Sequence, residues 1–368
     1  MPRNKIASDS ARKRIAVIPG DGIGTEVIRE AVKVLRAVTQ ACPTKLDFTE
    51  FDWGAERYLR DATTLPDNAV AMLRRDFDAI LFGAVGDPRV PSNKHAADIL
   101  LGLRAKLDLY VNLRPVELID AALTPLRDRG TSDINFVVLR ENTEGLYVGI
   151  GGQFQRGTPQ EVAVQEDVNT RRGVERIIRF AFEYARERRL GRVCMTDKSN
   201  ALSFGHELWR RVFSQVKDEY PDIESRHLYI DTLVMEMVRD PGQFQVIVTC
   251  NLFGDILGDL GAQLAGGLGL APSGNIHPGR ISLFEPVHGS APNIAGKNLA
   301  NPCGAVLAAA MMLDHLELAP QAETLRRAVR AAVREKHTTV DLGGTLGTRE
   351  AGDWLAEHVA KNGPELGS

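Results

Sequence analysis

The chain has 368 residues, of which 43% are hydrophobic and 25% are charged, and this indicates a soluble globular protein of about two domains. Its formal net charge of −3 argues against general binding to nucleic acid or to a membrane surface. The four cysteines have no paired spacing, which argues against a disulfide framework or a structural zinc site and favours the cytoplasm. No apolar run approaches the roughly 20 residues of a membrane span.

Short apolar runs alternate with amphipathic segments along the chain. Strands are predicted over residues 14–20, 77–86, 134–142, 192–197 and 244–253, which are rich in aliphatic residues. Helices are predicted over residues 25–38, 171–189 and 322–336, where apolar residues recur at helical spacing. This alternation predicts an α/β fold with a largely parallel sheet.

The segment PGDGIGTE, residues 19–26, lies between the first predicted strand and the first predicted helix. Turns at this position of α/β folds often face a ligand. The glycines stand at positions 20, 22 and 24, so they do not match the G-x-G-x-x-G pattern of a Rossmann domain. A tight strand-to-helix turn without a ligand is an equally good explanation of this stretch alone.

Three arginines, Arg104, Arg114 and Arg140, each lie near the end of an apolar segment. Guanidinium groups bind carboxylates in bidentate geometry, so three converging arginines would suit a ligand with two carboxylates. Lys198, just after a predicted strand, and Tyr147 are candidates for proton transfer. Each of these side chains, taken alone, also fits an ordinary surface or packing role.

The segment NLFGDILGDLGA carries Asp255 and Asp259 at positions i and i+4, on one face of a helix. Neighbouring carboxylates repel each other unless a positive group lies between them, and no Lys or Arg occurs from residue 251 to 279. A hard divalent cation would resolve this conflict, because carboxylate oxygens are its preferred ligands. A solvent-facing side of the helix is the alternative explanation.

Together these stretches resemble the metal-dependent β-decarboxylating 2-hydroxyacid dehydrogenases, the isocitrate/isopropylmalate dehydrogenase family. The resemblance covers about residues 14–350, through the motifs IPGDGIG, LRENTEGLY, TDKSNAL, NLFGDILGDLGA and SLFEPVHGSAPNIAGKNLANP and the pair Arg104 and Arg114. It implies a non-Rossmann, two-domain α/β fold with a mostly parallel sheet and a dimer arm over residues 146–170. The implied domains are a discontinuous cofactor-binding domain, residues 1–109 and 266–368, and a substrate, metal and dimerisation domain, residues 110–265.

The resemblance further implies active sites that are shared between the two subunits of a homodimer. Asp255 and Asp259 match ligands of Mg²⁺ or Mn²⁺, and Asp231 of the partner subunit matches a third ligand. Tyr147 matches the proton donor, and Lys198 of the partner subunit matches the residue that acts with Asp231 in base chemistry.

The implied substrate is a 2-hydroxy dicarboxylate, with the three arginines as a clamp on its malate part. The matching substrate-binding positions are Arg104, Arg114, Arg140, Leu100, Leu101 and Asp98. Isocitrate enzymes have a serine where Asp98 stands, and an anion there would repel their additional carboxylate. Leu100 and Leu101 match an apolar pair that receives a branched alkyl group, although tartrate/malate enzymes also carry leucines here and isopropylmalate enzymes usually have Glu in place of Ala97.

The implied cofactor is NAD. The matching cofactor-binding positions are Ile18, Gly20, Asn200, Glu285, His288, Gly289, Ser290, Ala291, Asn293, Ile294 and Asn301. Members of the family that use NAD usually have Asp-Ile at 293–294, and bacterial NADP-dependent isocitrate enzymes have Lys-Tyr. Asn293 and Ile294 provide no cation for a 2′-phosphate, which favours NAD.

The leading expectation is NAD-dependent oxidative decarboxylation of a 3-substituted (2R)-malate, with 3-isopropylmalate yielding 4-methyl-2-oxopentanoate in leucine biosynthesis. The alternatives are a D-malate/tartrate, homoisocitrate or specialised-metabolism enzyme of the same family, or a non-catalytic regulatory subunit. Such a subunit would be expected to lose its catalytic side chains, whereas this chain keeps Tyr147, Lys198 and the three aspartates.

Overall fold

The computed structural model describes residues 12–363, and the chain divides into two compact units. Unit 1 comprises Met1–Gly102 and Gly279–Ser368, and unit 2 comprises Leu103–Pro278. The sequence predicts these boundaries after residues 109 and 265, so unit 2 is longer at both ends than the predicted domain. The outermost residues of the predicted domains, 1–11 and 364–368, lie outside the described range.

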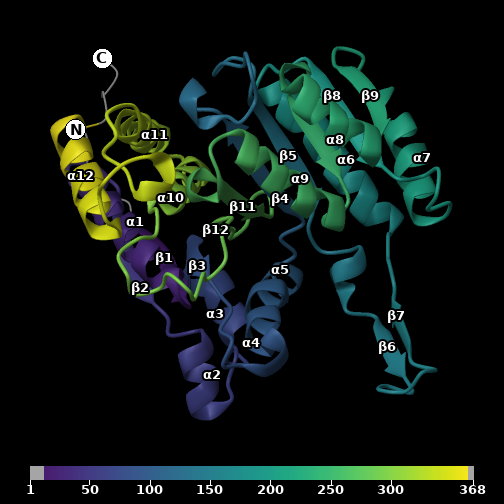
Figure 1. Cartoon of the computed structure of the whole chain (residues 1–368), viewed down its shortest axis with the longest axis horizontal. Helices are drawn as coiled ribbons and strands as arrows, with labels where there is room; N and C mark the ends of the chain where they lie inside the picture. Colours follow the sequence, from purple (N-terminus) through teal and green to yellow (C-terminus); the bar gives the residue numbers. More distant parts are fainter. Residues whose placement is uncertain (1–11, 364–368) are drawn as a thin grey trace, which may run out of the picture. The chain divides into compact units, whose positions relative to one another are not determined.

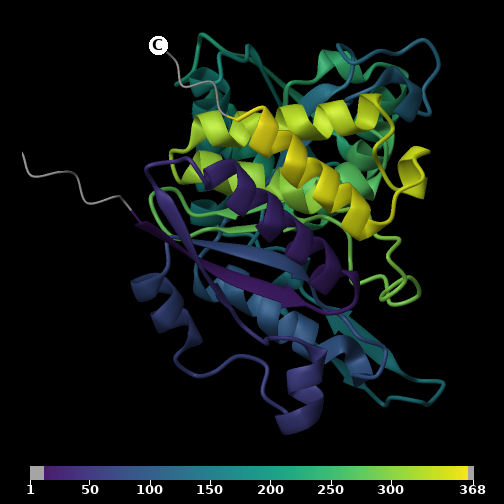
Figure 2. The same cartoon turned by 90° about the vertical axis from the view of Figure 1, so that its left-hand side faces the viewer.

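Unit 1 contains a parallel sheet with the strand order β2-β1-β3-β12. Its strands are β1 (Arg12–Gly20), β2 (Lys45–Glu50), β3 (Ala79–Ala84) and β12 (Leu283–Pro286). Its helices include α1 (Ile23–Thr39), α2 (Ala55–Asp61), α3 (Ala69–Asp76), α10 (Cys303–His315), α11 (Ala319–Arg334) and α12 (Thr348–Lys361). Figure 2 shows α1, in purple, beside the yellow α12. The buried stripe of α1 includes Val27, Ile28 and Leu35, which is the face that its apolar periodicity predicts.

A further helical segment begins in unit 1 and continues past the boundary at Gly102 into unit 2. It consists of η1 (Pro91–Asn93), α4 (Lys94–Ala96), the π-helical turn η2 (Ala97–Leu101) and α5 (Gly102–Lys106). A single π-helical turn inserted in a helix shifts the direction of the following side chains and often occurs at functional sites. This segment carries the predicted specificity residues Asp98, Leu100 and Leu101.

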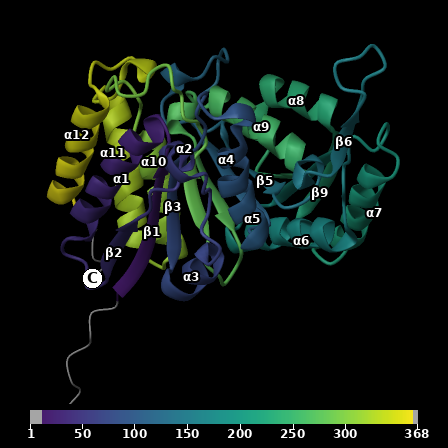
Figure 3. The ribbon, with the colours of Figure 1, turned by 90° about the horizontal axis from the view of Figure 1, so that it is seen from below.

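Unit 2 contains a mixed sheet with the strand order β11-β4-β5-β10-β8-β9, antiparallel at β11-β4-β5 and parallel from β5 onward. The strands are β4 (Val111–Glu117), β5 (Asn135–Glu141), β8 (Arg192–Asp197), β9 (Glu224–Tyr229), β10 (Val246–Thr249) and β11 (Pro272–Ile276). The helices are α6 (Arg171–Glu187), α7 (Gly205–Lys217), α8 (Ile230–Arg239) and α9 (Asn251–Leu264), with short turns η3 (Ala121–Leu123), η4 (Leu146–Val148), η5 (Pro241–Gln243) and η6 (Leu268–Leu270). In Figure 3, α8 and α9 lie on one side of this sheet and α6 and α7 on the other.

The core of unit 2 forms where α8 and α9 pack on the sheet. Leu233 and Met237 of α8 and Leu257 of α9 meet Val138 of β5 and Ile247 of β10, and all five side chains are fully buried. Each such side chain contributes about 1.5–3 kcal/mol by burial. This packing fixes the orientation of α9, which carries Asp255 and Asp259 on its other side.

A hairpin of β6 (Gly151–Phe154) and β7 (Val162–Gln165) extends from unit 2, away from its sheet (Figure 1). All residues of both strands are exposed, including the apolar side chains of Phe154, Val162 and Val164. The hairpin lies within residues 146–170, the stretch that the family resemblance implies to be a dimer arm.

The predicted fold class, α/β with mostly parallel strands, is confirmed. The strand predicted over residues 244–253 is too long, because β10 ends at Thr249 and α9 begins at Asn251. The apolar residues after Thr249 continue the apolar character of the strand, but they form the first turn of the helix. None of the helices within residues 12–363 is long and apolar enough to cross a membrane. All four cysteines are buried as free thiols.

Candidate active site

In unit 1, the glycine-rich turn after β1 lies against the loop that contains Ser290. Ile23 donates its backbone N–H to the Ser290 carbonyl oxygen at 2.9 Å. Gly20 has a positive φ of 73°, and a Cβ atom at this position would lie 2.0 Å from the carbonyl oxygen of Ala84 in β3. Glycine is therefore required for the close approach of the turn to β3. The fold thus brings together two segments that the resemblance assigns to the cofactor.

The predicted cofactor residues of unit 1 lie in β1, at the end of β12 and in the loop that follows β12. Asn301 is anchored, because its amide donates to Asp341 and accepts from the Cys303 N–H, both at 2.9 Å. Asn293 is exposed. The remaining predicted residue, Asn200, belongs to unit 2, where it is exposed in the turn after β8.

His288 provides a test of whether this loop fits a nucleotide. Its Nδ1 atom lies 3.0 Å from the carbonyl oxygen of Gly289. Its buried Nε2 atom has no hydrogen-bond partner within residues 12–363. Burial lowers the pKa of His288, so the ring is neutral at neutral pH. A buried polar atom without a partner is costly, and a polar ligand would satisfy it. The residues present therefore fit a nucleotide cofactor.

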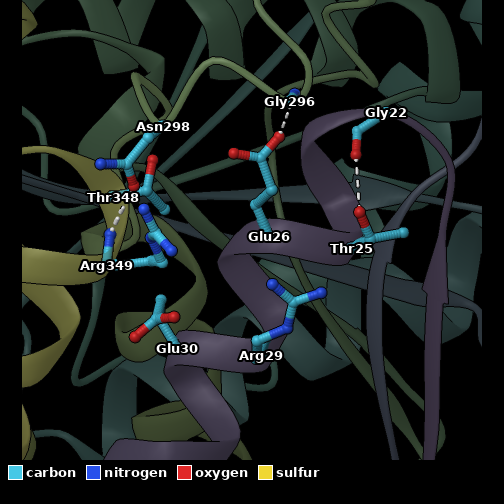
Figure 4. Close-up of a pocket in the computed structure, with 9 residues that line it drawn as sticks. All are labelled: Gly22, Thr25, Glu26, Arg29, Glu30, Gly296, Asn298, Thr348 and Arg349. Atoms are coloured by element: carbon cyan, nitrogen blue, oxygen red, sulfur yellow. Dashed lines mark hydrogen bonds between the residues drawn. The ribbon is translucent and has the colours of Figure 1, made fainter.

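A separate pocket of about 390 Å³ lies at the N-terminal end of α1 (Figure 4). The Glu26 carboxylate accepts the backbone N–H of Gly296 at 2.5 Å and so ties α1 to the loop after β12, although the two residues are 270 positions apart. The remaining charged groups of its lining are Arg29, Glu30 and Arg349. Two arginines and two glutamates balance in charge, so this pocket is not a good site for a dicarboxylate.

In unit 2, a cluster of charged residues surrounds Asp255. Its Oδ1 atom accepts hydrogen bonds from Arg114 at 2.9 Å and from Arg140 at 2.6 Å. Its Oδ2 atom accepts the Tyr147 hydroxyl at 3.1 Å, and the Arg140 guanidinium lies over the Tyr147 ring, 5.3 Å from its centre. Arg104 is buried and acts electrostatically on both Arg140 and Asp255. The structure therefore brings the three predicted arginines and Tyr147 together around Asp255.

Arg114 also reaches the second aspartate of α9, with Nη1 3.4 Å from Asp259 Oδ1. Arg114 from β4 and Arg140 from β5 therefore supply positive charge to the two carboxylates, in addition to any metal ion that they bind. No lysine or arginine is close to the two aspartates in sequence, but Arg114 and Arg140 are close to them in the folded chain.

The charges of the cluster shift its pKa values. Burial alone would raise the pKa of Asp255, but Arg140 and Arg114 bring it below its usual value. Burial raises the pKa of Asp259, and Arg114 offsets only part of this effect. Burial, followed by repulsion from the other two arginines, lowers the pKa of Arg140 to about 9, so it remains charged at neutral pH. Burial and the charge of Asp255 raise the pKa of Tyr147, which keeps its proton.

Asp255 and Asp259 fit two ligands of a hard cation. Their side chains are 38% and 60% exposed, on successive turns of α9, and carboxylate oxygens suit Mg²⁺ or Mn²⁺. Within residues 12–363, no three His, Cys, Asp or Glu side chains gather closely enough to hold a metal ion. Asp231 of the same chain therefore does not complete a ligand set, whereas the resemblance assigns this position to the partner subunit.

Lys198 and Asp231 form an ion pair of their own, between the turn after β8 and the start of α8. The hydrogen bond from Lys198 is the main cause that lowers the pKa of Asp231. The structure thus brings this predicted pair together, at a place where its side chains are 31% and 53% exposed. A deprotonated Asp231 beside the lysine suits proton transfer through the pair.

The predicted specificity residues lie on the helical segment of residues 94–106. Leu100 and Leu101 are half-buried, as expected for an apolar pair that is available to an alkyl group. Asp98 lies 2.5 Å from Lys94, and this exposed ion pair weakens the repulsion that Asp98 was expected to exert on an additional carboxylate.

Two asparagines that the sequence reasoning missed orient the arginines. Asn112 accepts from Arg114 Nε at 2.9 Å, and Asn251 accepts from Arg140 Nε at 2.8 Å. Asn112 and Arg114 are two residues apart on β4, so their side chains lie on one face of the strand. This spacing is the feature of the sequence from which the role of Asn112 could have been predicted.

Two glycines of α9 allow the arginines to pass beside the helix. A Cβ atom at Gly254 would lie 2.4 Å from Cβ of Arg140, and one at Gly258 would lie 2.5 Å from Nη1 of Arg114. The glycines precede Asp255 and Asp259 by one residue each, so they set the distance between the aspartates and the guanidinium groups.

Replacement of Gly254 by alanine should therefore displace Arg140. We expect a rise of about 10-fold in KM for the substrate and a loss of about 1–3 kcal/mol in stability from overpacking, reduced by the better helix propensity of alanine. Steady-state kinetics and thermal unfolding measure both quantities. Gly191→Ala is the control, because no atom lies within 4 Å of its added Cβ. An unchanged KM for Gly254→Ala would contradict the close packing of α9 on Arg140.

Known proteins resemble the chain over most of its length. The family model described as isocitrate/isopropylmalate dehydrogenase matches residues 14–355. The 3-isopropylmalate dehydrogenase of Thermobifida fusca is 48% identical over 95% of this chain and 98% of its own length. The 3-isopropylmalate dehydrogenase of Streptomyces coelicolor is 46% identical over 92% of this chain and 98% of its own length.

Solved structures show the same fold. The crystal structure of isocitrate dehydrogenase from Methylococcus capsulatus matches with a TM-score of 0.85 and 37% identity, over 95% of this chain and 99% of that chain. A β-decarboxylating dehydrogenase from Thermococcus kodakarensis matches with a TM-score of 0.76 and 39% identity, over 95% and 96%. The chain belongs to the isocitrate/isopropylmalate dehydrogenase family and is a decarboxylating dehydrogenase.

Proposed function

We propose that this enzyme oxidises and decarboxylates a 3-alkyl-substituted (2R)-malate, with 3-isopropylmalate as the leading substrate and NAD as the oxidant. The observation that carries the proposal is the cluster around Asp255, in which three arginines face two aspartates. The cluster has a net positive charge, which suits a dicarboxylate. Leu100 and Leu101, half-buried, would receive the alkyl group, and curated relatives at 46–48% identity are named 3-isopropylmalate dehydrogenases.

In the proposed mechanism, unit 2 supplies the groups that hold the malate part of the substrate. Arg104, Arg114 and Arg140 hold the carboxylates of the malate part and orient C2. The guanidinium groups are preorganised, since Asn112 and Asn251 fix two of them before the substrate arrives. When bound, a divalent cation at Asp255 and Asp259 would polarise the C2 oxygen, and NAD would accept the hydride.

Proton transfer is assigned to two sets of side chains. The Lys198–Asp231 pair takes the proton of the C2 hydroxyl, which allows the hydride to leave. After loss of CO₂, Tyr147 returns a proton to the substrate carbon. Tyr147 suits this role because its pKa is raised and its hydroxyl lies in the arginine cluster.

The cofactor is proposed to bind in unit 1, between the glycine-rich turn and the loop after β12. Two observations support this location: the hydrogen bond from Ile23 to Ser290, and the buried Nε2 atom of His288, which has no hydrogen-bond partner within residues 12–363. At Asn293 and Ile294 the loop offers no cation for a 2′-phosphate, so NAD is favoured over NADP. The uncharged Asn293 does not repel the phosphate, and discrimination should be weaker than with aspartate.

A substrate panel tests the proposal. The purified enzyme is assayed with Mn²⁺ and with NAD or NADP against 3-isopropylmalate, D-malate, tartrate, isocitrate and homoisocitrate, following cofactor reduction and release of CO₂. We expect kcat/KM for 3-isopropylmalate with NAD to exceed that of every other pair by about 10-fold or more, which is the discrimination that a few methylene groups provide. A higher value for another acid would replace the proposed substrate, and a preference for NADP would refute the proposed cofactor.

A further inference from the structure

His206, the second residue of α7, accepts a hydrogen bond from the main chain of Lys198. The backbone N–H of Lys198 donates to Nδ1 of His206 at 2.8 Å, and the imidazole is 2% exposed. Because Nδ1 accepts, it carries no proton, and the neutral ring has its proton on Nε2. That atom lies 3.9 Å from Oδ2 of Asp167. The ring is thus held by a hydrogen bond at Nδ1, and its Nε2 atom faces the Asp167 carboxylate.

The same ring contacts α9, since it packs edge-on against Phe253, with 5.2 Å between the ring centres. Phe253 precedes Asp255 by two residues in that helix. His206 therefore connects the main chain at Lys198 to the helix that carries both proposed metal ligands.

The N-terminus of α7 also docks on the base of the β6–β7 hairpin. Trp209 donates its indole N–H to Asn169 at 2.8 Å, and a Cβ atom at Gly205 would lie 2.7 Å from the Asn169 amide. Asn169 in turn donates to Asp167 at 3.0 Å. The close fit leaves little freedom for His206 at this end of the helix.

The turn that carries Lys198 is also held from its other side. Oδ1 of Asp197 accepts the Ser199 N–H and pairs with Nε2 of His227, both at 2.9 Å. With His206 bound at the next residue, the main chain of the turn is fixed at successive positions. The Lys198 side chain remains the part that reaches outward, to Asp231.

We propose that His206 is a positioning residue, whose Nδ1 atom fixes the main chain of Lys198 so that the lysine meets Asp231 in the geometry for proton transfer. This inference rests on the proposed function, in which the Lys198–Asp231 pair removes the hydroxyl proton. The acceptor atom is the essential feature, because the bulk and aromatic packing of the ring alone would not hold the Lys198 N–H.

Burial supports this role by lowering the pKa of His206, against the smaller opposing effects of Asp167 and Asp197. The charged groups that act on the ring are Asp167 at the base of the hairpin and Asp197 in the turn after β8. The ring is therefore neutral at neutral pH, and Nδ1 stays available as an acceptor. The unfolded chain binds the proton more readily, so the contribution of His206 to stability falls as the pH drops below about 6.5.

Two amide variants separate the acceptor from the rest of the ring. His206→Asn places its carbonyl oxygen near the position of Nδ1, whereas His206→Gln places its amide near Nε2, towards Asp167. We expect His206→Gln to lower kcat by about 10- to 100-fold with KM values for substrate and NAD unchanged, and His206→Asn to stay within about threefold of the wild type. Amide hydrogen exchange at Lys198 should be faster in His206→Gln and restored in His206→Asn.

Phe182→Leu is the control for a general loss of stability. Phe182 is a fully buried ring of α6 that stacks on Phe213 and Tyr220, so its truncation should lower the melting temperature and leave kcat unchanged. Equal kcat values for His206→Gln and His206→Asn would overturn the inference, as would an equal loss of kcat in Phe182→Leu. The proposed function fails separately, if the wild type oxidises none of the malates or if Lys198→Ala retains turnover.

Discussion

Replacement of Asp255 by asparagine should lower turnover by about 100- to 1000-fold and also destabilise the metal-free enzyme. The loss of turnover is expected because Asp255 is a proposed metal ligand and the shared partner of Arg114, Arg140 and Tyr147. The loss of stability, about 1–3 kcal/mol, is expected because two buried guanidinium groups lose their counter-charge. Steady-state kinetics with Mn²⁺ and thermal unfolding in EDTA measure the two effects.

Asp259→Asn is the matched control on the next turn of α9. Its side chain is 60% exposed, and its Oδ1 atom lies 3.4 Å from Nη1 of Arg114. Burial raises the pKa of Asp259, so the folded protein binds a proton more readily than the unfolded chain does, and the charged form lowers stability at neutral pH. The metal-free Asp259→Asn enzyme should therefore be as stable as the wild type or slightly more stable.

Both variants should lose turnover and most of the rise in melting temperature that Mg²⁺ or Mn²⁺ gives the wild type, since a ligand that binds only the native state stabilises it. Full activity of Asp255→Asn in EDTA would show that these carboxylates do not bind a catalytic cation. Equal stability of the two metal-free variants would instead contradict the role of Asp255 as counter-charge to the arginines.

Mixing inactive Lys198→Ala chains with inactive Asp255→Asn chains should restore about a quarter of the wild-type activity. Random pairing yields half heterodimers, and one of the two shared sites in each heterodimer has both residues intact. Exposed apolar side chains, Met235 and Val238 on α8 and Ile256 on α9, support an interface that involves these helices. Heterodimers that have been purified from this mixture through two different affinity tags should have about half of the wild-type activity, because one of their two sites is intact.

A mixture of Asp255→Asn and Tyr147→Phe chains is the control for this experiment. Both residues belong to the same side of the proposed shared site, as their hydrogen bond indicates, so neither site of that heterodimer is intact. Recovery in the control, or verified Lys198→Ala/Asp255→Asn heterodimers without activity, would contradict an active site shared between subunits.

The sequence alone determined the α/β class, the exact bounds of β8 and the family. Each of these depends on the periodicity or the order of residues that are close together in the chain. Contacts between residues that are far apart in the chain could not be predicted in this way. Asp255 and Asp259 were visible as a pair on one helix face, but Arg140 and Arg114 lie 115 and 145 residues away from their aspartate partners. Only the pairing of β4 with β5, and the packing of α9 on them, brings those charges to the aspartates.

Tertiary structure also decided the sign of an expected effect. If Asp255 only repelled Asp259, removal of its charge would stabilise the metal-free enzyme. Because Asp255 also pairs with two buried arginines, its removal should destabilise the metal-free enzyme. The partners of Lys198 were likewise set by tertiary structure, since α7 and α8 bring His206 and Asp231 to it from 8 and 33 residues away. Which residue types can react is a property of the sequence. Which charge each one faces depends on how strands and helices that are distant in the chain pack together.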